Sequence, residues 1–233
     1  MKSNAWRSYA LAVGIALTLR WGAVEAYVVP SGSMIPTLMV NDHIFVNKAA
    51  YGVRVPFSRK WLMRYGTPAR GEVIVFRSPE PEGLTLVKRV VGVAGDRVEY
   101  DGRILTLNGA AVPAVPSGGE SLSRVPSGAL EEAKGDHVEL VEALPGRTHA
   151  VIQRSFAASM ALEAFTVPPG HVFVMGDHRD NSRDSRAWGV VPVENLYGRA
   201  ELVWLACERK IPVAEVFCDP LKMSWDRLGE PVR

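Results

Sequence analysis

The stretch LTLVKRVVGV, residues 84–93, has the composition of a buried β-strand but contains two adjacent basic residues. It is rich in β-branched side chains, which favour strands. Because successive side chains of a strand point to opposite faces, Lys88 shares one face with Leu86 and Val90, whereas Arg89 lies on the other. One of the two cations must therefore point inward or line a cleft, unless the strand lies at a sheet edge, where both can reach solvent.

Similar strand-like runs lie on both sides of this stretch. They are DHIFVNK (42–48), GEVIVF (71–76), DRVEYDGRILTLNG (96–109), HVELVEAL (137–144), RTHAVIQRS (147–155), HVFVMGD (171–177) and RAELVWLACER (199–209). Most of these runs are bounded by Gly, Pro, Asn or Asp, and no long run with the helical period of 3.6 residues separates them. Residues 113–135 are instead rich in Pro, Gly and Ser, which indicates loops. We therefore predict an all-β fold, mainly of antiparallel sheets, whose core is split by an insertion over residues 113–165.

An apolar run, SYALAVGIALTL at residues 8–19, lies near the N-terminus. It is shorter than the roughly 20 residues that usually span a bilayer, and it resembles the apolar region of a cleavable signal peptide, with small residues at both ends of residues 24–26. Arg20 favours an uncleaved anchor, because its aliphatic stem can extend the apolar segment while its charge reaches the interface. Lys2 and Arg7 then keep the N-terminus in the cytoplasm, so the rest of the chain lies on the other side.

Composition excludes several classes of protein. The 27 basic and 25 acidic residues are not gathered in blocks, so we expect no nucleic-acid partner. Only Cys207 and Cys218 are present, too few for a disulfide-rich scaffold and too far apart for a CxxC motif. They can form a disulfide if the domain lies outside the cytoplasm, or remain two buried thiols. Without recognisable metal-ligand spacing, we expect no metal and no cofactor.

PSGSMIPT, residues 30–37, is too rich in proline for a helix and too polar to extend the apolar run. Ser33 in this loop is a nucleophile only if a base removes its proton, and most serines in such loops are turn residues. None of the histidines lies in a distinctive context; they are His43, His137, His149, His171 and His178. Lys88 is the other candidate base, because burial disfavours its ammonium form and lowers its pKa toward neutrality.

A third polar segment, GDHRDNSRDSRAWG at residues 176–189, interleaves acidic and basic side chains. Asp184 and Arg186 are spaced to pair locally, and Ser182 can form a hydrogen bond with an amine. A solvated turn held by salt bridges can have the same composition, so this segment alone does not decide its role.

Four motifs after the apolar N-terminal run together resemble the bacterial type I signal peptidases, membrane-bound leader peptidases with a Ser/Lys dyad. The motifs are PSGSMIPTL (30–38), RGEVIVF (70–76), VKRVVGVAGD (87–96) and GDHRDNSRDSRAWG (176–189), and the similarity extends over about residues 19–205. His178 stands where the family frequently has Asn. The resemblance implies five segments: a membrane anchor (1–26), a first part of the catalytic β core (27–112), an inserted region (113–165), a second part of the core (166–212) and a C-terminal tail (213–233).

The resemblance also implies roles for individual residues. Ser33 would be the nucleophile and Lys88 the general base, while the backbone N–H of Ser33 and the hydroxyl of Ser31 would form the oxyanion hole. Ser182 would orient the lysine amine, Asp184 and Arg186 would form a supporting ion pair, and Asp177 belongs to the same motif. Two substrate pockets would be lined by mostly apolar side chains: Val29, Pro30, Met34, Leu38 and Leu86 in the first, and Tyr27, Val75 and Val87 in the second.

Pockets of this kind would accept small residues, so the expected substrates are exported preproteins with Ala-X-Ala signals, bound as an added β-strand. We expect a monomer in the bacterial cytoplasmic (inner) membrane, with one membrane pass and an extracytoplasmic catalytic domain. A specialised pilin or conjugation-system signal peptidase of the same fold would use the same dyad. A non-catalytic anchored β domain would bind extended peptides without needing Ser33. The self-cleaving repressors share a related Ser/Lys fold, but the chain lacks their DNA-binding helical region.

Overall fold

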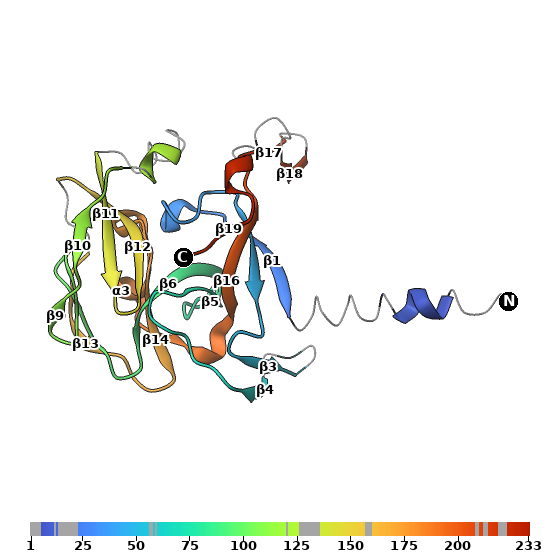
Figure 1. The fold of residues 1–233 in the computed structure, drawn as a ribbon. Coiled ribbons are helices and arrows are strands. Elements are labelled where there is room, and N and C mark those ends of the chain that lie inside the picture. Colours follow the sequence, from blue (N-terminus) through green and yellow to red (C-terminus); the bar gives the residue numbers. More distant parts are fainter. Residues whose placement is uncertain are drawn as a thin grey trace.

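The computed structural model describes residues 6–11, 13, 23–55, 58, 60–119, 121–125, 136–156, 160–207, 210–211, 214–218 and 223–233. All pairings between its named strands are antiparallel, which confirms the predicted mainly antiparallel β fold. Figure 1 shows two lobes, one of which contains β1 (Val24–Val28).

The larger lobe is built on an eight-stranded sheet in the order β1-β2-β16-β5-β6-β14-β15, with β19 paired to β16. Its further strands are β2 (His43–Asn47), β5 (Val73–Arg77), β6 (Thr85–Val93), β14 (His171–Met175), β15 (Val191–Pro192), β16 (Leu196–Leu205) and β19 (Glu230–Pro231). The stretch LTLVKRVVGV forms β6, between β5 and β14 rather than at the sheet edge. Both faces of its second half are therefore buried, from Val87 to Gly92.

The smaller lobe contains two further sheets. One joins β13 (Leu162–Thr166) to β7 (Arg97–Tyr100), β8 (Leu105–Leu107) and β9 (Ala110–Ala111), and the other joins β10 (Ala114–Pro116) to β11 (His137–Leu144) and β12 (Arg147–Arg154). The strands of this lobe thus begin at Arg97, earlier in the chain than the predicted start of the insertion at residue 113. Two hairpins complete the strands: β3 (Gly52–Arg54) with β4 (Trp61–Arg64), and β17 (Lys210–Ile211) with β18 (Ala214–Cys218).

Helices are short. The named helical elements are η1 (Gly32–Met34), η2 (Leu122–Arg124), η3 (Arg179–Asn181), α3 (Ser185–Trp188), η4 (Val193–Asn195) and η6 (Trp225–Arg227). Residues 6–11 and 13 are also helical. Within the described residues, no helix has the length and apolar character needed to cross a membrane. Most of the predicted anchor over residues 1–26 lies outside the described residues, and its last residues, from Val24, belong to β1.

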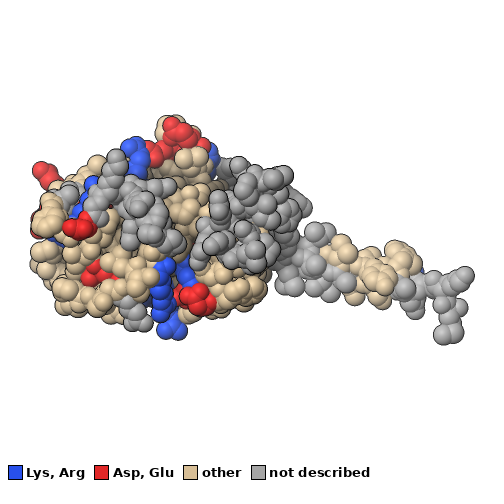
Figure 2. Space-filling model, turned by 90° about the horizontal axis from the view of Figure 1, so that it is seen from above, with Lys and Arg blue, Asp and Glu red and all other residues tan. Residues whose placement is uncertain are grey.

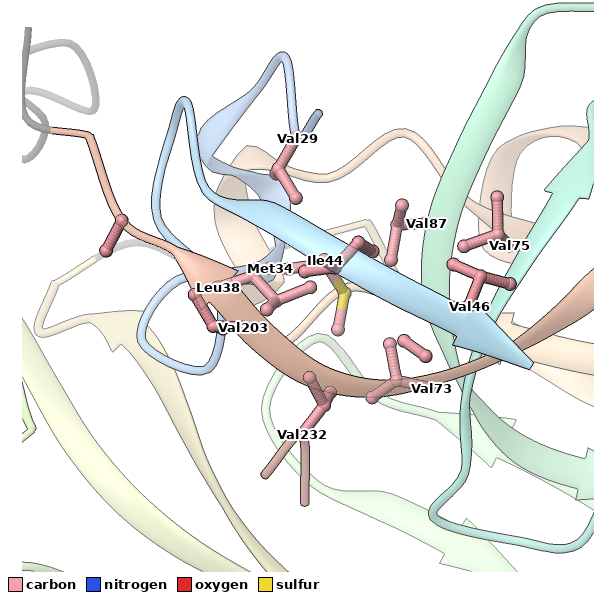
Figure 3. Close-up of a cluster of buried hydrophobic side chains, with 12 residues drawn as sticks. Val29, Met34, Leu38, Ile44, Val46, Val73, Val75, Val87, Val203 and Val232 are labelled. Atoms are coloured by element: carbon pink, nitrogen blue, oxygen red, sulfur yellow. The ribbon is translucent and has the colours of Figure 1, made fainter. Parts of the chain in front are cut away.

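The core of the larger lobe is an apolar cluster between β1, β2, β5, β6 and β16, shown in Figure 3. It includes Met34 and Leu38 from the PSGSMIPTL segment, so this loop is held against the sheet by its own side chains. The C-terminal segment also packs on this lobe, because Val232 joins the cluster and buried Arg227 forms an ion pair with Asp42 at 2.7 Å.

Charged residues of both signs are interspersed on the face of the molecule seen in Figure 2, which fits the absence of charge blocks in the sequence. Cys207 and Cys218 form a disulfide, with 5.7 Å between their Cα atoms. The structure thus selects one of the two alternatives that the sequence leaves open for this pair.

Candidate active site

Lys88 and Ser33 lie in direct contact, although 55 positions separate them in the chain. The distance from Lys88 Nζ to Ser33 Oγ is 2.7 Å, and the amine also lies 3.0 Å from the carbonyl oxygen of Val87. Both side chains are buried, and Lys88 is only 3% exposed. A serine hydroxyl is therefore paired with a desolvated amine, which is the geometry that activation of the hydroxyl by a base requires.

Burial changes the protonation of Lys88. Desolvation lowers the pKa of its amine to about 8, although the negative charges of Asp184 and Asp177 act in the opposite direction. At mildly alkaline pH, a large fraction of the amine is therefore neutral and can accept a proton.

Ser33 lies in the turn η1, which leads into the apolar core through Met34. The hydroxyl of Ser31 lies 3.4 Å from the hydroxyl of Ser33, and Ser31 is exposed to solvent. Gly32 leaves little room for a larger residue, because a Cβ there would come within 3.0 Å of Ile35 Cδ1. The Ser31 hydroxyl, which is expected to serve in the oxyanion hole, thus lies beside the hydroxyl of the expected nucleophile.

The polar segment 176–186 packs directly against this loop. Asp184 forms two hydrogen bonds with the Arg186 guanidinium, at 2.8 and 2.7 Å, and accepts a third from the backbone N–H of Gly176 at 2.9 Å. Burial alone would raise the pKa of Asp184, but Arg186 outweighs it and holds this pKa below its usual range. The predicted ion pair is present and buried.

Ser182 is half-buried beside Gly176, and its hydroxyl oxygen is shielded from solvent. Its hydroxyl forms no hydrogen bond of standard geometry with the described residues, but it is close enough to Asp184 to help lower the pKa of that carboxyl. A side chain on Gly176 would overlap both the Ser182 hydroxyl and the Ser33 carbonyl oxygen. The absence of a side chain at this position is what allows the two serine segments to meet.

Arg89 is a site residue whose role the sequence pattern does not reveal. Its guanidinium is completely buried and binds both carboxylate oxygens of Asp177, at 2.8 and 2.7 Å. It also donates to the Gly71 carbonyl at 2.7 Å and to the Thr37 hydroxyl at 3.1 Å. Asp177 thus has a defined place, as the buried partner of the cation next to Lys88 and of the loop that contains Ser33.

His178 is a second residue that sequence reasoning leaves without a role. Its backbone N–H donates to the Ser33 carbonyl at 3.1 Å, and its ring lies 3.3 Å from that of His137, measured between the Nε2 atoms. Burial, followed by the proximity of His137, lowers the pKa of His178 to about 4, so the ring is neutral at physiological pH. His178 supports the nucleophile loop through its backbone.

The apolar side chains expected to line the substrate pockets divide between two clusters. Val29, Met34, Leu38, Val75 and Val87 are buried together, with Tyr27 packed against them. Leu86 packs against a separate cluster on the other side of β6, and Pro30 is exposed. The grouping of Leu86 with Met34 and Leu38 in one pocket stays a prediction.

One group of side chains in the described part of the chain has the spacing of a metal site, namely His43, Cys207 and Cys218. Because the two sulfur atoms are joined in a disulfide, they are not available as thiolate ligands in this state.

Comparisons with known proteins show the family of the chain. A family model described as signal peptidase, peptidase S26, matches residues 3–205. A signal peptidase I of Pseudomonas fluorescens is 40% identical over 205 residues, covering 82% of this chain and 68% of that protein. A signal peptidase I of Rickettsia bellii is 32% identical over 226 residues, covering 88% of this chain and 73% of that protein. A crystal structure of a signal peptidase I from Enterococcus faecalis aligns with 57% of this chain and 96% of its own, at 27% identity and a TM-score of 0.35. The chain therefore belongs to the signal peptidase I family, peptidase S26, and is a serine peptidase that acts in signal peptide removal.

Proposed function

We propose that the enzyme is a membrane-anchored endopeptidase that cleaves exported preproteins after Ala-X-Ala signals, with Ser33 as the nucleophile and Lys88 as the general base. The observation that carries this proposal is the 2.7 Å contact between the buried Lys88 amine and the Ser33 hydroxyl. The lowered pKa of Lys88 supports the same role, because it makes the neutral amine available near pH 8.

In the proposed reaction, neutral Lys88 removes the proton of Ser33 as Oγ attacks the scissile carbonyl carbon. The carbonyl electron pair moves to oxygen, where the Ser33 N–H and the Ser31 hydroxyl donate hydrogen bonds. The tetrahedral intermediate then collapses, the scissile C–N bond breaks, and the Lys88 ammonium protonates the leaving amine. Water, deprotonated by Lys88, hydrolyses the acyl-enzyme ester and restores the Ser33 hydroxyl. The protons and electrons balance without a cofactor.

An open strand edge next to the dyad supports binding of an extended peptide. The register between β6 and β14 ends at Arg89 opposite Met175, whereas the register between β6 and β5 continues to Thr85. Residues Thr85–Lys88 therefore have a strand partner on one side only among the described strands. A peptide added at the free edge would form main-chain hydrogen bonds that need no particular sequence, with small side chains selected by the neighbouring apolar residues.

The anchor completes the proposal. Residues 8–19 would lie in the bacterial cytoplasmic membrane, with the N-terminus in the cytoplasm and both lobes outside. Because β1 begins at Val24 and the dyad serine follows at residue 33, the site would be close to the membrane surface. A preprotein whose apolar signal lies in the same bilayer would present its cleavage site at a matching height. We expect the enzyme to act as a monomer.

The test is cleavage of a preprotein with an Ala-X-Ala signal by the detergent-purified chain, with the cleaved bond identified by mass spectrometry. Ser33→Ala should abolish cleavage, and Ser31→Ala should lower kcat about 10²-fold through loss of an oxyanion donor. Ser123→Ala, at an exposed serine of the smaller lobe, is the matched control and should cleave normally. Binding without cleavage by the unaltered enzyme would favour a peptide-binding domain, and cleavage of pilin-type substrates alone would favour a dedicated peptidase.

A further inference from the structure

The smaller lobe contributes a buried carboxylate to the segment that supports the dyad. Glu142, on β11, binds both terminal nitrogens of the Arg179 guanidinium, at 2.8 and 2.6 Å. Glu142 is 2% exposed and Arg179 is 1% exposed, so the ion pair is shielded from water. Burial would raise the pKa of Glu142, but Arg179 and then His149 outweigh it and hold the pKa at about 2. The pair therefore remains charged throughout the pH range of the reaction.

Arg179 connects this pair to the dyad through a short chain of contacts. Its backbone carbonyl accepts a hydrogen bond from Arg186 at 2.8 Å, and the same guanidinium holds Asp184. Asp184 in turn accepts from the N–H of Gly176, the residue against which Ser182 and the Ser33 carbonyl pack. Each member of the chain is fixed by at least one interaction with the next.

Two backbone contacts from β12, the strand paired with β11, hold the same segment. The N–H of Ile152 donates to the Asp177 carbonyl at 2.9 Å, and the N–H of Arg154 donates to an Asp180 carboxylate oxygen at 2.6 Å. The β11–β12 hairpin thus contacts the 176–186 segment by main chain and by an ion pair. Such bonding by supporting residues is what keeps a catalytic group in its productive position.

We infer that Glu142 is a positioning residue of the Ser33–Lys88 site, and that the hairpin β11–β12 orients the segment that surrounds the lysine. This inference rests on the proposed function. Replacing Glu142 by Gln removes the negative charge with little change in shape and leaves the Arg179 cation uncompensated in the interior. The 176–186 segment then loses one of its restraints from the hairpin, while the substrate-binding edge of β6 is untouched.

The expected result is a kinetic change of a defined kind. Glu142→Gln lowers kcat about tenfold or more, because a small displacement of the groups around Lys88 misaligns proton transfer. KM stays within about twofold, since Glu142 does not contact the peptide edge. The charges that act on Lys88 are Asp184, Asp177 and Arg186, and both aspartates raise its pKa. A looser segment weakens the attraction of these carboxylates, so the midpoint of the pH–rate profile moves to lower pH, by about half a unit.

The experiment compares the full chain in detergent with Glu142→Gln, Arg179→Met, their double variant and Glu139→Gln. Glu139 is a matched control, because it is a buried glutamate on the same strand whose carboxylate accepts from the N–H of Leu122. kcat, KM, the pH midpoint and the melting temperature are measured on a signal peptide substrate. If Glu142 acts through Arg179, the double variant loses no more activity than the more impaired single variant.

The inference is overturned if Glu142→Gln, corrected for the folded fraction, matches Glu139→Gln in kcat and in the pH midpoint, even where its melting temperature falls. Additive losses in the double variant would also overturn it. Failure of the proposed function is recognised separately, because Ser33→Ala or Lys88→Ala would then retain activity whatever the Glu142 variants do.

Discussion

Arg89 and Asp177 form a buried ion pair beneath the nucleophile loop, joined by two hydrogen bonds of 2.8 and 2.7 Å. Burial alone would raise the pKa of Asp177, but Arg89 outweighs it and holds this pKa below its usual range. Arg89 lies one position after Lys88 and points to the opposite face of β6. The same strand therefore supplies the candidate base on one face and the anchor of its surroundings on the other.

Arg89→Met is expected to destabilise the fold strongly. The Asp177 carboxylate would remain buried with the Thr37 hydroxyl as a close partner but without its cation, and breaking a buried pair from one side typically costs about 3–5 kcal/mol. Urea unfolding at pH 7 measures this loss. Arg97→Met, at an exposed arginine of β7, is the control and should change stability by less than about 0.5 kcal/mol. Equal stabilities of the two variants would mean that the pair contributes nothing to the fold.

Gly176→Ala should remove most activity. The added Cβ would overlap the backbone carbonyl of Ser33 and the side chain of Ser182, so the nucleophile loop and the supporting segment must separate. We expect a loss in kcat of about 10²-fold, the size of effect that a misplacement of about 1 Å produces. Gly118→Ala adds the same methyl group where nothing lies within 4 Å and should be fully active. If Gly176→Ala cleaves as fast as Gly118→Ala, close packing of the two serine segments is not required.

Lys88→Met should give an inactive but more stable protein at neutral pH. The amine has a pKa of about 8 when folded, against an ordinary value near 10.5, so below pH 8 the fold must bury a charge at a cost of about 3 kcal/mol. Between pH 8 and pH 10.5 the amine is mostly protonated in the unfolded chain but mostly neutral in the folded protein. The stability of the unaltered protein therefore rises with pH in this range. Lys88→Met removes this cost but also loses the two hydrogen bonds of the amine, so the variant should be about 2 kcal/mol more stable at pH 7. This advantage should disappear above pH 10.5, where the amine is neutral in both states. A variant that is less stable at pH 7 would show that burial of Lys88 carries no such cost.

The disulfide between Cys207 and Cys218 should stabilise the larger lobe. It closes a loop of 11 residues, for which the chain-entropy relation gives about 3 kcal/mol. The double variant Cys207→Ser/Cys218→Ser should therefore unfold at lower urea concentration than the unaltered protein under oxidising conditions. In the presence of a reducing agent the difference should largely vanish, and a difference that persists would have to come from the serine side chains instead.

The sequence predicts the sheet-forming segments well, because they depend on local patterns. The run at residues 137–144 forms β11 with the same limits, and LTLVKRVVGV forms β6 from Thr85 to Val93. The alternation in β6 predicts that one of its two cations points inward, whereas both do, because strands on both sides and packing on both faces enclose this strand. Local patterns cannot reveal this enclosure.

Contacts between distant segments explain what the sequence pattern misses. Arg89 pairs with Asp177, which lies 88 positions later in the chain, and Glu142 of the smaller lobe pairs with Arg179. No periodicity links such residues, since the packing of the two lobes brings them together. Ser33 and Lys88 are equally distant in this sense, and they are found from the sequence only because four motifs together resemble one enzyme family.

The most direct test of the Ser33–Lys88 mechanism is kcat/KM as a function of pH on an Ala-X-Ala signal peptide, because this quantity reports the pKa of the base in the free enzyme. Activity should rise through a midpoint at about pH 8, the pKa to which burial lowers Lys88. Ser33→Ala and Lys88→Met should each lose at least about 10⁴-fold across the whole range. A midpoint near ~10.4, the pKa of a free lysine, would contradict the mechanism, and so would substantial cleavage by either variant.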